Sequence, residues 1–187
     1  MAASRRKELL LLTVLATLLL VAAGCNSSTD DPDVSESIVS MASADPTEAC
    51  VDYDGEEGDE GGIVFTGVTQ AILLESRVRG TSPPAVWQDV VLSQVRISYD
   101  MTVDGAVPAP APQVKAMQGT VPAGGTLEYP MVTVEAVDIA DGLFERGDQG
   151  RIVLEFSGED VSGKPVTATG NIRLFTASEC GTGGGGS

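Results

Sequence analysis

Apolar and polar side chains alternate along most of the chain after residue 62, and a period of two residues is typical of β-strands. The clearest runs cover residues 68–78, 91–103, 113–118 and 126–137. A closing pair of runs, residues 152–156 and 166–174, flanks a turn-rich segment and predicts a hairpin. We therefore expect an all-β fold, a single antiparallel β-sandwich of about seven strands, with no helix after the first 24 residues.

Each strand is expected to turn alternate side chains toward the core. The inward face of the first run carries Val68, Gln70, Ile72, Leu74, Ser76 and Val78, and that of the second carries Val91, Ser93, Val95, Ile97, Tyr99, Met101 and Val103. In the closing hairpin the inward residues are Ile152, Leu154, Phe156, Val166, Ala168, Gly170, Ile172 and Leu174, with Phe175 on the opposite face. Trp87 is the only tryptophan, and we expect it to plug the core or a sheet edge rather than to serve as a ligand platform.

The first 24 residues have the organisation of a cleaved, helical signal peptide. Residues 5–7 are basic, and an apolar run at residues 9–23 follows them. That run is shorter than the roughly 20 residues that a transmembrane helix needs, so an uncleaved anchor helix is the less favoured alternative. We therefore expect residues 1–24 to direct secretion.

Val21, Ala22, Ala23, Gly24 and Cys25 resemble the bacterial lipobox. The resemblance implies cleavage after residue 24 and acylation of the new N-terminal cysteine, which makes Cys25 the lipidation site. It implies three acyl chains, and several chains attach a protein stably whereas one binds only reversibly. The expected location is the cell envelope: the outer membrane if the source has two membranes, because Asn26 replaces the aspartate that favours inner-membrane retention, and otherwise the outer face of the cell membrane.

Three segments lack a strand pattern. Residues 25–49, rich in Ser, Asp, Ala and Pro, are expected to form the lipidated N-terminus and an acidic flexible tether, followed by a sandwich domain at residues 50–180. Within that domain, residues 52–62 hold the densest acidic cluster and are expected to form a solvated loop. Residues 181–187 form a flexible, glycine-rich tail.

Composition limits the partners, catalytic mechanisms and metal sites that this chain is expected to have. The formal net charge is −16, which disfavours nucleic acid as a partner. The chain has no histidine, the commonest general base and the commonest metal ligand, so most hydrolase, zinc and copper mechanisms lose their usual groups. We expect no cofactor. A loose calcium site at residues 52–62 stays open as an alternative, although the EF-hand spacing fails there, because Glu57 and Ile63 occupy positions six and twelve counted from Asp52.

Cysteine usage predicts one disulfide. Once Cys25 is acylated, Cys50 and Cys180 remain, one just before and one just after the strand-patterned region. Outside the cytoplasm they are expected to pair, with two free thiols as the alternative.

Two sequence segments resemble those of a known class of proteins. The segments Gly119-Thr-Val-Pro-Ala-Gly-Gly-Thr126 and Phe156-Ser-Gly-Glu-Asp-Val-Ser-Gly163, together with the strand pattern, look like those of bacterial lipoproteins with immunoglobulin-like or fibronectin type III-like domains. The resemblance implies an immunoglobulin-like sandwich and brings no catalytic residues.

These observations favour a membrane-anchored, non-enzymatic binding or structural module over an enzyme. Its partner is expected to be another envelope or surface protein, or a surface glycan, contacted through the loops at residues 79–89, 104–112 and 138–150. A calcium-dependent adhesion module is the first alternative. The second is a glycan-acting enzyme that uses carboxylates alone, for which the candidates are Asp138, Asp141, Glu145 and Asp148.

Overall fold

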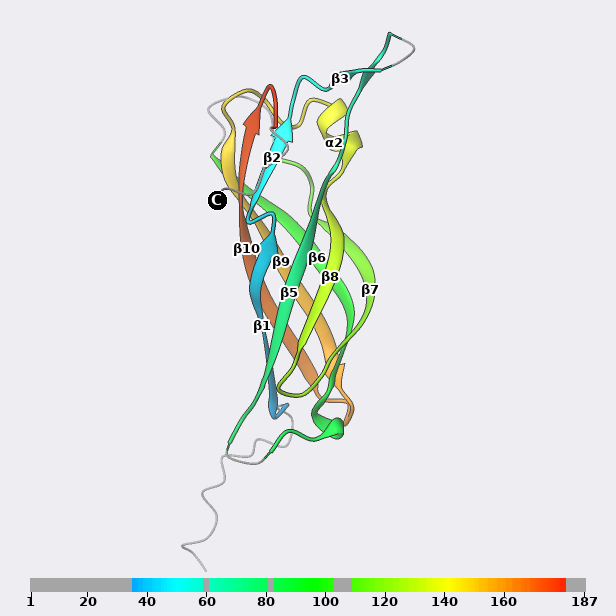
Figure 1. Cartoon of the computed structure of the whole chain (residues 1–187), viewed down its shortest axis with the longest axis vertical. Coiled ribbons are helices and arrows are strands. Elements are labelled where there is room, and N and C mark those ends of the chain that lie inside the picture. The colour runs from blue at the N-terminus through cyan, green and yellow to red at the C-terminus, as the bar shows by residue number, and fades with distance from the viewer. Residues whose placement is uncertain (1–34, 59–60, 81–82, 103–108, 181–187) are drawn as a thin grey trace, which may run out of the picture. The chain divides into compact units, whose positions relative to one another are not determined.

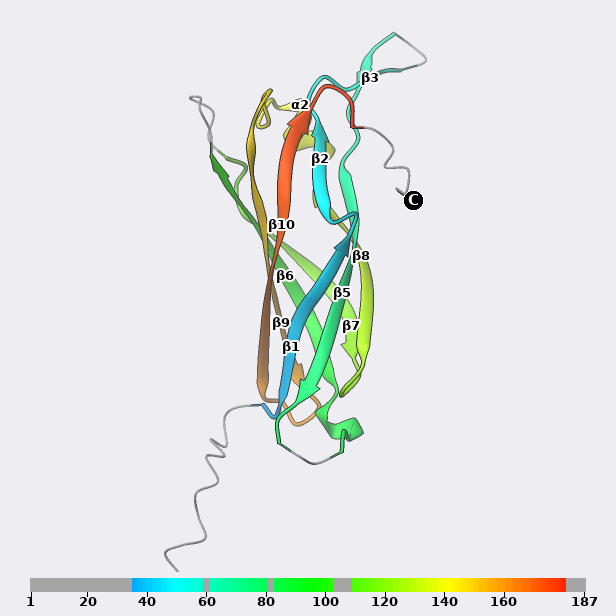
Figure 2. The ribbon, with the colours of Figure 1, turned by 60° about the vertical axis from the view of Figure 1, so that its left-hand side comes forward.

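Two β-sheets packed face to face make up most of the computed structural model, which describes residues 35–58, 61–80, 83–102 and 109–180 (Figures 1 and 2). The three-stranded sheet has the order β1 (Ser37–Asp45), β5 (Val68–Val78), β8 (Thr126–Val134). The five-stranded sheet has the order β2 (Glu48–Asp52), β10 (Pro165–Ala177), β9 (Gln149–Asp160), β6 (Val90–Thr102), β7 (Gln113–Val121). A small hairpin of β3 (Glu56–Glu57) and β4 (Ile63–Val64), the 3-10 helix η1 (Val86–Gln88) and the short helix α2 (Ala136–Ala140) complete the described elements.

The expected all-β sandwich is confirmed, with two corrections. Strands β1, β5 and β8 share one sheet, while β6, β9 and β10 lie side by side in the other. The described sandwich has eight strands, close to the expected number of about seven, but β2 pairs with β10 in parallel, so the sheets are not wholly antiparallel. The segment at 136–140, expected to be strand and loop, is the helix α2.

Alternation predicted the inward faces of β5, β9 and β10 correctly. In β5, Gln70, Ile72, Leu74 and Ser76 are all buried. In the closing hairpin the buried residues include Ile152, Leu154, Phe156, Val166, Ala168, Ile172 and Leu174, and they meet the residues of β5 and β6 in one core. These positions alternate with exposed ones because successive side chains of a strand point to opposite faces.

A β-bulge overturns the prediction for the first half of β6. The pairing of β6 with both β7 and β9 shifts between Leu92 and Gln94, so Ser93 is the extra residue. Val91 and Ser93, expected inward, are therefore exposed, and Val90 and Leu92 take their places in the core. Gly158 lies against this bulge, where a Cβ atom would come within 2.2 Å of the carbonyl oxygen of Val91.

The expected tether at residues 25–49 is wrong for its second half. Residues 37–45 form β1, which pairs antiparallel with β5 and buries Val39. The chain then crosses to the other sheet through Pro46, whose carbonyl oxygen accepts a hydrogen bond of 2.7 Å from the buried side chain of Gln70. The folded domain therefore begins well before Cys50.

Hydrogen bonds fix the end of the sandwich at which the described chain begins. Ser35 Oγ donates to Asp160 Oδ2 at 2.6 Å, and Ser37 Oγ donates to the carbonyl oxygen of Gln88. Burial raises the pKa of Asp160, but hydrogen bonds from the side chains of Ser162 and Ser35 and from backbone N–H groups outweigh it and hold that pKa below its ordinary value. The first described residues are thus held beside η1 and the β9–β10 turn.

Candidate functional site

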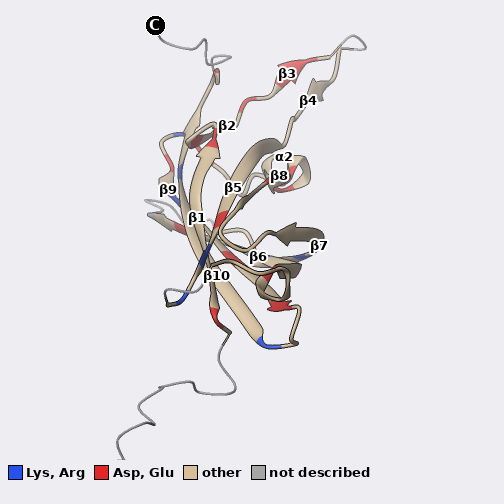
Figure 3. Ribbon diagram, turned by 60° about the horizontal axis from the view of Figure 1, so that its bottom comes forward, with Lys and Arg blue, Asp and Glu red and all other residues tan. Residues whose placement is uncertain are grey.

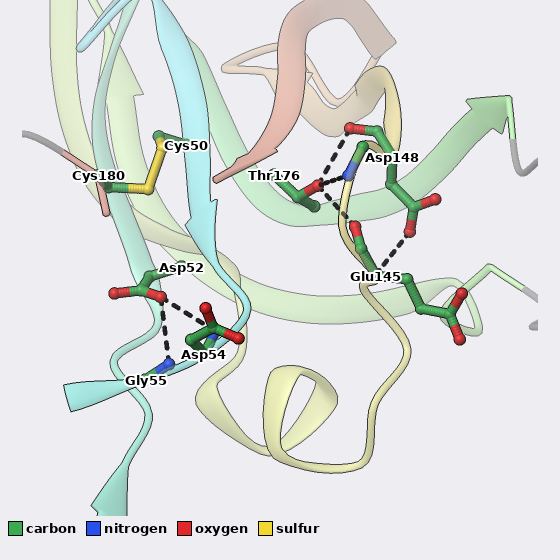
Figure 4. The surroundings of a disulfide bond; sticks show 9 residues. Cys50, Asp52, Asp54, Gly55, Glu145, Asp148, Thr176 and Cys180 are labelled. Carbon is green, nitrogen blue, oxygen red and sulfur yellow. Dashed lines mark hydrogen bonds between the residues drawn. A yellow bond between two sulfur atoms is a disulfide. The ribbon is translucent and has the colours of Figure 1, made fainter. Parts of the chain in front are cut away.

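The opposite end of the sandwich collects the features that distinguish this domain from a plain β-sandwich. There β2 and β10 end, the β3–β4 hairpin extends beyond the sheets, and α2 follows β8 (Figure 1). The disulfide lies at the same end (Figure 4). We call this the distal end, because the described chain begins at the other one.

The disulfide joins Cys50 of β2 to Cys180, three residues after β10, as the sequence predicts. The two Cα atoms lie 5.7 Å apart, within the usual range for a disulfide. Cys50 is opposite Phe175 in the parallel register of β2 and β10, and the N–H of Tyr53 donates to the carbonyl oxygen of Ala177. The bridge therefore holds the short strand β2 to the last strand of the sheet.

A pocket of about 420 Å³ opens between the disulfide and the β3–β4 hairpin. We call it the hairpin pocket; it is lined by Cys50, Asp52, Gly55, Glu56, Val64, Thr66, Gly67, Val68 and Cys180. Asp52 shapes one wall, because its Oδ1 accepts hydrogen bonds of 3.1 Å from the N–H groups of both Asp54 and Gly55 (Figure 4). Gly55 has φ of +68°, and a Cβ atom there would lie 2.6 Å from Ile63 Cγ2, so this turn requires glycine.

The walls of the hairpin pocket combine negative charge with apolar surface. Asp52 and Glu56 contribute carboxylates, and Figure 3 shows acidic residues on β3. On β4, the apolar side chains of Ile63 and Val64 expose 66% and 54% of their surface. Such a site suits a cationic side chain with an aliphatic stem, since lysine and arginine lay the stem on apolar surface and keep the charge at its rim.

The acidic segment 52–62 is thus a turn and a two-stranded hairpin rather than a featureless loop. Glu56 pairs with Val64 and Glu57 with Ile63. Residues 59 and 60 lie outside the described part of the chain. Across the residues that are described, no group of three or more His, Cys, Asp or Glu side chains is placed to hold a metal ion.

Two of the four carboxylates considered for glycan hydrolysis, those of Asp138 and Asp148, form hydrogen bonds within the domain. The buried carboxylate of Asp148 accepts a hydrogen bond of 2.7 Å from the Glu145 N–H. The backbone carbonyl oxygen of Asp148 accepts another from the Thr176 N–H (Figure 4). Asp138, on α2, accepts from Gln113 Nε2 at 2.8 Å. Asp141 follows α2 as its C-cap residue. Asp148 therefore organises its own loop and does not present its carboxylate to a substrate.

A polar cluster under α2 ties the strands together at the distal end. Tyr99 Oη donates to the carbonyl oxygen of Thr133 at 2.7 Å, and burial, reinforced by the charges of Asp138 and Glu135, raises the pKa of Tyr99. Burial also raises the pKa of Asp138. Lys115 bridges β7 and β8, since its Nζ donates to the carbonyl oxygen of Val132 and forms an ion pair with Glu135.

The three loops expected to form the contact surface do not lie together. Residues 138–150 lie at the distal end, and Gln113, just after residues 109–112, is bonded to Asp138 there. The described residues of the loop at 79–89, which are 79–80 and 83–89, lie at the opposite end and include η1. Residues 104–108 are outside the described part of the chain. Trp87, expected in the core or at a sheet edge, lies on η1 with 51% of its surface exposed.

Sequence reasoning missed the exposure of the two residues of β4. The residues Ile63 and Val64 fit the beginning of the alternating region, but nothing in the pattern marks them as exposed. The glycines that precede them, Gly61 and Gly62, are a turn signal that agrees with a hairpin.

Cys25, the expected signal peptide at residues 1–24 and the expected tail at residues 181–187 lie outside the described residues. No helix within the described ranges is long and apolar enough to cross a membrane. Neither a protein family nor a curated protein matches this sequence.

Proposed function

We propose that this chain is a lipid-anchored protein of the cell envelope whose immunoglobulin-like sandwich binds another envelope protein through the hairpin pocket. The observation that carries the proposal is the placement of the pocket at the end of the sandwich opposite Ser35. Cys25 precedes Ser35 by ten residues, so a lipid on Cys25 would attach the chain at the end of the sandwich opposite the pocket. The anchor itself is supported by the lipobox resemblance of residues 21–25.

The chemistry of the pocket suggests what the partner offers. Asp52 and Glu56 favour a positive charge, while Val64 and Val68 provide an apolar wall beside them. We therefore expect a protein segment with a lysine or arginine next to an apolar residue. Electrostatic attraction of such a segment to the acidic hairpin speeds encounter, and contact with the apolar wall stabilises the complex. Binding, not catalysis, is the role that this surface supports.

The anchor is tested by substitution of its cysteine. In cells fed an alkyne-labelled palmitate, the wild-type chain is expected to become labelled and to sediment with membranes, whereas a Cys25→Ser variant is expected to be unlabelled and not to sediment. The reason is that no other residue near the cleavage site carries a thiol. Equal labelling of the wild-type chain and the variant would contradict the proposal.

The binding surface is tested by site-specific photocrosslinking in intact cells. A benzoylphenylalanine at position 63, on the exposed face of β4, is expected to give a discrete adduct with an envelope protein. The same probe at Val114, 64% exposed on β7 in the five-stranded sheet, is the matched control and is expected to give none.

The charge requirement is tested on the same adduct. An Asp52→Asn, Glu56→Gln double variant is expected to weaken the adduct from position 63. An Asp100→Asn variant, which removes an exposed carboxylate paired with Arg151, is expected to leave it unchanged. Adducts of equal yield from positions 63 and 114 would exclude the hairpin pocket as the binding surface.

A further inference from the structure

The end of the sandwich nearest Ser35 carries an exposed apolar tip, formed by Val86, Trp87 and Val161. Their exposed fractions are 78%, 51% and 57%. The three residues are neighbours, because the N–H of Val161 donates to the carbonyl oxygen of Asp89 at 3.1 Å and the N–H of Asp89 donates to that of Val86. The β9–β10 turn and η1 thus present one apolar surface.

The acidic groups at this end are bonded into the protein. Gln88 Nε2 donates to Glu36 at 2.9 Å, and the N–H of Ala123 donates to Asp89 at 2.8 Å. Asp160, only 5% exposed, accepts from Ser35, Ser162 and the N–H of Lys164. Arg79, Glu159 and Lys164 also lie near this end, and two of these three residues are basic. The tip is therefore much less acidic than the chain as a whole.

The length of chain before Ser35 places the tip close to the proposed anchor. Cys25 precedes Ser35 by ten residues, and a chain of that length spans at most about 33–36 Å. Ser35 is bonded to Asp160, the residue before Val161. An acyl group on Cys25 would therefore hold the apolar tip within reach of lipid headgroups at high effective concentration.

We propose that Val86, Trp87 and Val161 insert into the headgroup boundary of the membrane that holds the acyl anchor, so that the sandwich stands on this end. The inference rests on the lipid anchor of the proposed function. Tryptophan prefers this boundary, because its ring is apolar and its N–H remains able to bond to water or headgroups. The expected surface is zwitterionic, since the net charge of −16 is repelled by anionic lipid.

Trp87 is the only tryptophan, so its fluorescence reports directly on the tip. The full-length acylated protein is reconstituted into phosphatidylcholine vesicles, with and without lipids brominated near the headgroup. We expect a blue-shifted emission that the brominated lipids quench. The quenching is expected to fall in a Val86→Ser, Val161→Ser variant and to be unchanged in Val137→Ser, which alters a residue of α2 at the distal end that is 60% exposed.

Three other outcomes would overturn the inference. They distinguish failure of the contact between tip and lipid from failure of the lipid anchor. Unquenched emission from protein whose N-terminal peptide carries acyl chains by mass spectrometry would overturn the tip contact and leave the anchor intact. A blue shift that rises with protein concentration but ignores brominated lipid would indicate contact with a second copy of the chain. Absence of acyl chains from the N-terminal peptide would overturn the anchor and, with it, the reason for the tip to meet lipid.

Discussion

Removal of the Cys50–Cys180 bridge is expected to lower the free energy of unfolding by up to roughly 5 kcal/mol. The bridge closes a loop with a sequence separation of 130, which contains nearly the whole sandwich. In the chain-entropy model a loop of that length restricts the unfolded chain strongly, so its loss stabilises the unfolded state. The measurement is urea denaturation of the wild-type sandwich domain and of a Cys50→Ala, Cys180→Ala double variant, each followed by circular dichroism.

The control for this experiment is the reducing agent itself. Dithiothreitol is expected to shift the midpoint of the wild-type domain toward that of the double variant and to leave the double variant unchanged. Because β2 is an edge strand that pairs with β10 alone, over five residues, its amide protons are also expected to exchange faster in the double variant than those of β9. Equal midpoints with and without the bridge would show that it does not stabilise the fold.

The parts of the fold that sequence predicts best are those whose inward and outward faces differ in chemistry. β5 and the β9–β10 hairpin each bury one set of alternate residues, and their boundaries lie within a few residues of the expected ones. Two polar residues, Gln70 and Ser76, are buried in β5 and fit the same alternation. Gln70 donates to the carbonyl oxygen of Pro46, whereas Ser76 Oγ has no hydrogen-bond partner among the described residues. A strong two-residue period therefore survives even where two of its members are polar.

Two errors have a common physical cause, which is that strand pairing is not local. β1 was expected to be part of a tether because it is rich in serine and alanine, yet pairing with β5 supplies its backbone partners and only a few side chains need to be buried. In β6, the alternation Val91, Ser93, Val95 runs unbroken through the bulge at Ser93. Nothing in that segment alone distinguishes one face from the other, because the partner strands determine where the extra residue lies.

The candidate site was only half predictable for a similar reason. The disulfide follows from the number and positions of cysteines, and the acidic segment is plain in the sequence. Their proximity depends on the parallel pairing of β2 with β10, which brings Asp52 opposite Ala177. The exposure of Ile63 and Val64 depends on the β3–β4 hairpin extending beyond the sheets.

The second large effect is expected from Phe156→Ala, which should destabilise the domain by about 3–5 kcal/mol. Phe156 is fully buried at the middle of β9, where it lies between Val95 of β6 and Ala168 of β10. Truncation to alanine loses the burial of the ring and leaves a cavity, since both neighbouring strands are fixed by their own hydrogen bonds and cannot close over it. The free energy of unfolding is measured by urea denaturation with the disulfide intact, so that the unfolded states remain comparable.

Phe175→Ala is the matched control for this prediction, because it makes the same chemical change in the same hairpin. Phe175 lies on the opposite face of β10, as its place in the alternation predicts, and is only partly buried. Its truncation is expected to cost clearly less than that of Phe156, since a partly exposed ring loses less burial and leaves a space open to water. A larger loss at Phe175 would mean that the outer face of the sheet, where Phe175 lies opposite Cys50 of the disulfide, contributes more to stability than the space between the sheets.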